Sequence, residues 1–114
     1  MSDCIFCKIV DKEIPADIVY EDDLVVAFND IEPQAPTHIL VIPKEHIESL
    51  NEIHEDHKQL IGHIHLVIKK LAKESNIADK GYRIVSNCGK EGGQTVDHIH
   101  YHIIGGRNLT WPPG

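Results

Sequence analysis

Residues 94–106 read Gln-Thr-Val-Asp-His-Ile-His-Tyr-His-Ile-Ile-Gly-Gly, and this stretch determines most of what the sequence predicts. Histidines occur at every second position among residues that favour β-strands: His98, His100 and His102. Side chains two positions apart in a strand point the same way, so a strand over residues 96–104 places the three imidazoles on one open face. The opposite face has the apolar character of a core, with Ile99, Tyr101 and Ile103.

Imidazoles beside a glycine-rich turn are suited to binding an anion, holding a metal ion or attacking phosphorus. Alternating histidines on a strand can hold a catalytic zinc ion with water as the fourth ligand. Alternatively, the middle imidazole is a nucleophile or phosphate ligand that its neighbours orient. Residues 92–95, Gly-Gly-Gln-Thr, offer backbone N–H groups and a hydroxyl, which favours phosphate binding.

A catalytic imidazole needs an acceptor behind it to hold its proton on the far nitrogen. Asp97 is adjacent in sequence, but strand alternation sends it to the opposite face. We therefore expect a backbone carbonyl or a neighbouring histidine to orient His100.

The rest of the chain predicts an α+β fold with a five-stranded antiparallel sheet, one long helix and a short N-terminal helix. The spacing of apolar residues predicts a short helical turn near residues 5–9 and a long helix over residues 56–75. Runs of β-formers predict five strands, of which the first two form a hairpin with an acidic turn: residues 18–20, 24–28, 38–42, 81–86 and 96–104. His54 and His57 lie three apart in a polar segment and are expected on the solvated surface.

The size of the chain predicts a single domain over residues 1–114. Its formal net charge of -7 argues against DNA or RNA as a partner but permits a small nucleotide. No apolar run approaches the ~20 residues of a membrane span and no signal-peptide pattern is visible, so we expect a cytoplasmic protein without a membrane partner. The odd number of cysteines, with the pair Cys4-x-x-Cys7, predicts a metal or redox motif rather than a disulfide framework.

Several motifs together resemble one known family. Residues 98–104 are similar to the His-x-His-x-His-x-x motif, with x apolar, that defines the histidine triad superfamily. Other segments resemble its nucleotide-binding branch: residues 5–9, 13–15, 30–38, 41–44, 92–94 and 111–114. The resemblance implies a homodimer whose two five-stranded sheets join into one. It also implies a purine nucleotide bound at the face that carries the triad, and no cofactor for catalysis.

Members of this family hydrolyse nucleoside phosphoramidates and aminoacyl adenylates through a nucleotidyl-histidine intermediate, so the resemblance implies a purine nucleoside phosphoramidase. Its catalytic residues map onto four positions: His100 as the nucleophile, His102 as its support, His38 in the same cluster and Thr95 as donor to the leaving group. The nucleotide site also maps onto this chain, with Asp30 at the ribose, a purine pocket of Ile5, Phe6, Ile9, Phe28 and Ile31, and phosphate or leaving-group contacts from Asn87, Gly93, Thr95, His100 and His102. The alternative is a nucleotide-binding regulatory or scaffolding protein whose hydrolysis is incidental.

Some bacterial relatives hold a structural zinc ion with a cysteine pair and two histidines. In this sequence the resemblance assigns that site to four residues: Cys4, Cys7, His46 and His98. Two thiolates and two imidazoles suit tetrahedral zinc. The competing interpretation is that the cysteines are small buried apolar residues. If His98 binds zinc, its role is structural, and His100 and His102 remain for the chemistry.

Overall fold

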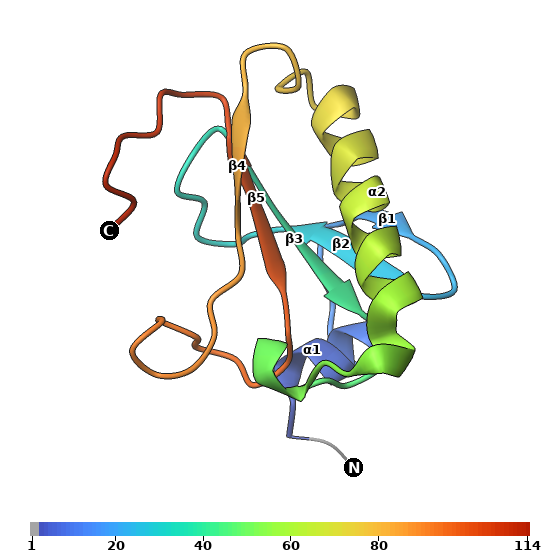
Figure 1. The fold of residues 1–114 in the computed structure, drawn as a ribbon. Coiled ribbons are helices and arrows are strands. Elements are labelled where there is room, and N and C mark those ends of the chain that lie inside the picture. The colour runs from blue at the N-terminus through green and yellow to red at the C-terminus, as the bar shows by residue number, and fades with distance from the viewer. Residues whose placement is uncertain (1–2) are drawn as a thin grey trace.

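The structure, a computed structural model, describes residues 3–114 and contains one five-stranded antiparallel sheet in the order β1-β2-β3-β5-β4 (Figure 1). The strands are β1 (Ile18–Glu21), β2 (Val25–Asn29), β3 (Thr37–Pro43), β4 (Tyr82–Val85) and β5 (Tyr101–Gly105). The helices are the short α1 (Ile5–Val10) and the long α2 (Lys58–Glu74), with 3₁₀ turns η1 (Leu50–Glu52) and η2 (Glu55–His57) before α2. The predicted α+β architecture is confirmed.

The sheet is covered on both faces, which explains the continuous apolar runs of residues 25–28 in β2 and 39–43 in β3. Alternate residues of β2 and β3 join the α2 side: Val25, Ala27, Ile39 and Val41. The residues between them pack with α1 on the other side: Val26, Phe28, Leu40 and Ile42. Because side chains alternate along a strand, His38 on β3 faces the α1 side together with Leu40.

Helix α2 buries one apolar stripe against the sheet, consisting of Ile64, Val67, Ile68, Leu71 and Ala72. On β5, Tyr101 and Ile103 belong to this same core, and Ile99 joins them just before the strand. The predicted apolar face is therefore confirmed. Because Tyr101 and Ile103 face α2, His102 between them projects to the α1 side.

The last strand is shorter than predicted, since β5 begins at Tyr101 rather than at residue 96. Pairing with β3 ends at Val41 opposite Tyr101, and two residues further along β3 Pro43 has no N–H to donate to a longer ladder. The Pro43 carbonyl instead accepts from His98 Nε2 (2.9 Å), and Ile99 N–H donates to Ile47 O (2.6 Å). The prediction of three histidines on one open strand face is wrong, because His98 and His100 precede the strand and are 0% and 4% exposed.

The prediction of solvated surface is also wrong for His57, which is 6% exposed. Its Nδ1 accepts from His54 N–H (3.1 Å) and its Nε2 donates to Glu45 Oε2 (3.0 Å). His57 thus links the start of α2 to the loop that follows β3, whereas His54 is exposed as expected.

None of the helices between residues 3 and 114 combines the length and hydropathy that crossing a bilayer requires.

Candidate active site and metal centre

A cavity of about 510 Å³ opens on the α1 side of the sheet. Its walls come from α1, the end of β2, the loop between β2 and β3, and the segment before β5. Ten of the residues to which the sequence assigned catalysis or nucleotide binding line it: Ile5, Phe6, Ile9, Phe28, Asp30, Ile31, His38, Thr95, His100 and His102, with Thr95, His100 and His102 assigned to both roles. The aromatic floor is formed by Phe6 and Phe28, whose rings meet edge to face at 5.7 Å.

The orientation of His100 is set by one hydrogen bond. Its Nδ1 lies 2.7 Å from the carbonyl oxygen of His98, and a carbonyl can only accept, so Nδ1 carries the hydrogen. In the neutral ring the lone pair is then on Nε2. Phe6 packs edge-on against the imidazole at a centroid distance of 5.0 Å and fixes its plane. The expectation of a backbone carbonyl behind His100 is confirmed, and Asp97 is exposed.

His38 and His102 form a directed pair. Gln34 N–H donates to His38 Nδ1 (3.0 Å), so the neutral His38 ring carries its hydrogen on Nε2. That nitrogen lies 2.9 Å from His102 Nδ1 and 3.4 Å from Asp30 Oδ2. His102 therefore accepts at Nδ1 and presents an N–H at Nε2. Burial, reinforced by the neighbouring His100 and His38, lowers the pKa of His102 to about 4, so the ring is neutral near pH 7.

Two of the residues assigned to phosphate or leaving-group contacts are not among those that line the cavity. Asn87 Nδ2 donates to Gly92 O (2.7 Å), and Gly93 N–H donates to Lys90 O (3.1 Å). Gln94 N–H likewise donates to Gly89 O (3.0 Å). These three groups close the glycine-rich turn, whereas Thr95, immediately after it, lines the cavity.

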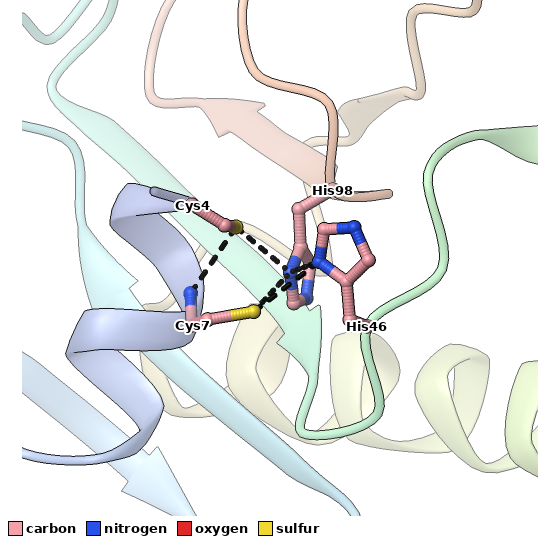
Figure 2. A group of neighbouring side chains, drawn as sticks. All are labelled: Cys4, Cys7, His46 and His98. Atoms are coloured by element: carbon pink, nitrogen blue, oxygen red, sulfur yellow. Dashed lines mark hydrogen bonds between the residues drawn. The ribbon is translucent and has the colours of Figure 1, made fainter. Parts of the chain in front are cut away.

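A second cluster joins the N-terminal cysteines to two histidines from distant parts of the chain (Figure 2). One ligand atom from each of Cys4, Cys7, His46 and His98 lies within 4.8 Å of the other three. Cys4 Sγ and Cys7 Sγ lie 3.3 and 3.5 Å from His98 Nδ1, and Cys7 Sγ lies 3.2 Å from His46 Nδ1. The four groups that the sequence assigned to zinc are thus brought together.

The chemistry of these four groups fits a zinc ion. Ligands at zinc bond lengths of about 2.0–2.3 Å in a tetrahedron are separated by about 3.5 Å, close to the spacings in the cluster. His98 Nε2 donates to Pro43 O, which leaves the Nδ1 lone pair directed at the cysteines. Burial lowers the pKa of His98, which keeps that lone pair unprotonated. The Nδ1 atoms of His46 and His98 also face each other at 3.2 Å, a contact that a cation between them would stabilise.

Comparison with known proteins places this site in a family. A family model described as "Scavenger mRNA decapping enzyme C-term binding" matches residues 3–110. The chain is 52% identical over 105 residues to the purine nucleoside phosphoramidase of Escherichia coli, with 92% of this chain and 88% of that protein covered. The chain belongs to the histidine triad (HIT) family.

Other HIT proteins match over nearly the whole chain. An uncharacterized HIT-like protein of Synechococcus elongatus is 56% identical over 112 residues, which cover 98% of this chain and 97% of that protein. The crystal structure of a HIT family hydrolase from Legionella pneumophila superimposes with a TM-score of 0.97 at 51% identity, covering 98% of this chain and all of that one. The similarity to these hydrolases identifies the protein as a HIT-family hydrolase.

The sequence interpretation missed several residues that line the cavity on the α1 side of the sheet, among them Leu40, Val96 and the segment Ile14–Asp17. Leu40 could have been found, because it is two positions from His38 on a strand and shares its face. The Ile14–Asp17 segment carries no periodic signal. It reaches the cavity because Asn29 Nδ2 donates to Asp17 Oδ2 (2.8 Å), which ties that segment to the end of β2.

Proposed function

We propose that this protein is a purine nucleoside phosphoramidase that hydrolyses P–N bonds, and the related mixed anhydride of aminoacyl adenylates, through a nucleotidyl-histidine intermediate. One observation carries the proposal. The Nδ1–H of His100 donates to His98 O, so Nε2 of the neutral ring carries the lone pair. The same ring lines an apolar cavity of nucleotide size. A fixed neutral imidazole with a free lone pair is a good nucleophile toward phosphorus.

In the first step, His100 Nε2 attacks the α-phosphorus and the P–N bond breaks. The electron pair of that bond goes to the amine nitrogen, which takes a proton delivered through the Thr95 hydroxyl. His100 then carries a positive charge, which the Nδ1–H···O=C bond to His98 stabilises. His102 Nε2–H donates to a phosphoryl oxygen, and His38 holds that ring in the required tautomer.

In the second step, a water molecule attacks phosphorus and the bond to His100 Nε2 breaks. The nitrogen recovers its lone pair, the nucleoside monophosphate leaves, and a proton of the water restores the donor used in the first step. The phosphoimidazole is positively charged, which makes the imidazole a good leaving group. The net reaction consumes one water and yields a free amine and a nucleotide.

The apolar walls suit a purine. Ile31 is 93% exposed and Ile5 is 48% exposed at the mouth of the cavity, where a flat base would cover both. Covering apolar area of this kind stabilises a complex by about 25 cal/mol per Å² removed from water. Asp30 lies at the same opening with Oδ1 bonded to Glu32 N–H (2.8 Å), so its orientation toward the ribose hydroxyls is fixed.

The decisive test replaces His100 with Asn. We expect His100→Asn to fold and bind AMP, but to hydrolyse adenosine 5′-phosphoramidate at the rate of buffer alone. His54→Asn is the matched control, because His54 is exposed and Asn also caps a helix well. Retained turnover would remove His100 from the nucleophile role. Tight AMP binding without turnover in the wild type would instead favour a nucleotide-binding regulatory protein.

We also propose that Cys4, Cys7, His46 and His98 hold a structural zinc ion. Elemental analysis of protein prepared without a histidine tag should find about one zinc per chain, as one Cys2His2 site requires. The His98→Asn variant should lose that metal, whereas His54→Asn should keep it. The assignment would be contradicted if the metal-free wild type and the same protein incubated with zinc had equal thermal stability.

We further propose a homodimer in which two copies pair along β4. This strand is at the edge of the sheet, so one row of its backbone N–H and C=O groups pairs with no strand among residues 3–114. Ile84 on β4 is 41% exposed and Leu66 on α2 is 66% exposed, apolar surface that a second copy would cover. Light scattering should give twice the mass of the chain for the wild type and for a Leu50→Lys control, and a lower mass for Ile84→Lys. A monomeric wild type would refute this assembly.

A further inference from the structure

The side chain of Gln94 uses every polar atom it has. Its Oε1 accepts from Gly89 N–H (2.9 Å), and its Nε2 donates to both Glu48 O (2.7 Å) and Val96 O (2.9 Å). Each polar group of the amide then has a partner, although Gln94 lies in a half-buried position between two loops, the one before β5 and the one after β3. Such a side chain fixes the positions of the segments that it joins.

The first of these segments is the glycine-rich turn. Gly89 and Gly93 have φ values of 76° and 81°, and a Cβ on Gly92 would lie 2.4 Å from the carbonyl oxygen of Cys88. The turn therefore depends on glycine. Glycine backbone is the most flexible in the unfolded chain and brings no side chain with which to pack, so the turn must be held from outside.

The second segment is the loop after β3. Glu48 is two residues from His46 of the metal cluster, and the Ile47 carbonyl between them accepts from Ile99 N–H (2.6 Å). This loop is thus bonded to the segment before β5 at two successive positions. The loop is therefore fixed in position, and the Gln94 side chain, bonded to Glu48 O and to Gly89 N–H, holds the turn against it.

Thr95 follows Gln94 directly and lines the candidate active-site cavity. We propose that Gln94 is a positioning residue for the phosphate end of this site: its amide holds the glycine turn and Thr95 where the phosphate and leaving group are bound. The inference rests on the proposed function. A residue that acts on this end alone changes the handling of phosphate and leaves the binding of the nucleoside unchanged, because the purine and ribose contacts come from α1, β2 and Asp30.

The test compares AMP with adenosine as ligands of Gln94→Glu, a change that nearly keeps the shape of the side chain. The carboxylate still accepts from Gly89 N–H, but it has no hydrogen for the carbonyls of Glu48 and Val96. Because a small misplacement of a positioned group has a large effect on rate, we expect AMP affinity to fall about tenfold and kcat for adenosine 5′-phosphoramidate to fall about 10- to 100-fold. Adenosine affinity should stay within about twofold of the wild type. Gln59→Glu places the same charge on the exposed surface of α2 and should change none of these values.

Gln94→Met keeps the length of the side chain and adds no charge. It replaces Gln94→Glu as the test variant if Gln94→Glu does not fold. Equal losses of AMP and adenosine affinity, unchanged kcat, or unfolding of both variants would show a purely structural role and overturn the proposal. A wild type that binds AMP no better than adenosine would also overturn it. A wild type that prefers AMP yet lacks turnover would refute the phosphoramidase function alone, since the binding comparison requires no reaction.

Discussion

Replacing Gly106 with alanine should destabilise the protein and slow its reaction together. Gly106 follows β5 with a φ of 94°, and a Cβ there would lie 2.9 Å from Pro36 Cβ and 3.2 Å from Pro36 Cγ. Pro36 ends the loop between β2 and β3, which lies beside the C-terminal tail (Figure 1). The same loop contains Gln34, whose N–H sets the tautomer of His38.

The two effects of the added methyl group have known sizes. A left-handed backbone is less favourable for alanine than for glycine by about 1–2 kcal/mol. Overpacking against a ring that is fixed in the chain contributes about 1–3 kcal/mol more. We therefore expect the free energy of unfolding to fall by about 2–5 kcal/mol. If Pro36 moves to relieve the contact, the Gln34–His38 bond lengthens and kcat falls as well.

Urea denaturation of the two Gly→Ala variants provides the assay. Gly62 is the matched control, because it lies in α2 and an added Cβ would meet no atom of residues 3–114 within 4 Å. Alanine is also the better helix former there by about 1 kcal/mol. The same chemical change should thus lower stability at position 106 and raise it slightly at position 62. Equal stability of Gly106→Ala and the wild type would refute this account of the contact with Pro36.

Three further predictions concern the stability of the protein. Asp22 accepts from Leu24 N–H, Val25 N–H, the Tyr20 hydroxyl and His63 Nε2, and although burial acts in the opposite direction, these bonds hold its carboxyl pKa far below the usual range. Asp22→Asn should therefore lower the free energy of unfolding by about 1–3 kcal/mol, measured with urea at pH 7. The pKa of His102 is about 4 when folded and near 6.5 when unfolded, so the unfolded chain binds the extra proton and stability should fall as pH decreases from about 6.5 to 4, a slope that His102→Asn should reduce. Chelation of metal should lower the melting temperature of the wild type and leave that of Cys7→Ser unchanged, as read by circular dichroism.

Periodicity predicted the parts of the fold that depend on local sequence. Alternation around residues 99–103 correctly assigned Ile99, Tyr101 and Ile103 to the core, because one buried face imposes a period of two. The apolar stripe of α2 was visible for the same reason at a period near 3.6. The family resemblance implied that His38 and His102 share one site, and the two rings are in contact at 2.9 Å.

Long-range polar contacts explain what the sequence did not reveal. His57 is buried because Glu45, 12 residues earlier, accepts its Nε2 hydrogen, and no periodic pattern encodes that pairing. The strand β5 starts late because His98 bonds to Pro43, 55 residues away. In the glycine-rich turn, the amide of Gly93 is used within the turn itself, which depends on backbone angles that composition does not specify.

His98 explains why the histidines of the motif are not equivalent. Its ring is fixed at both nitrogens, by the Pro43 carbonyl at Nε2 and by the cysteine and histidine cluster at Nδ1, and the residue is fully buried. The peptide that follows is fixed as well, because Ile99 N–H donates to Ile47 O (2.6 Å) and shares its plane with the His98 carbonyl, which therefore points in one direction. That carbonyl accepts the Nδ1 hydrogen of His100 and thereby selects the nitrogen that faces the cavity. The orientation of the His100 ring is therefore set by a residue whose own side chain lies in the cysteine and histidine cluster, and whose partner Cys4 is 94 positions away in the sequence.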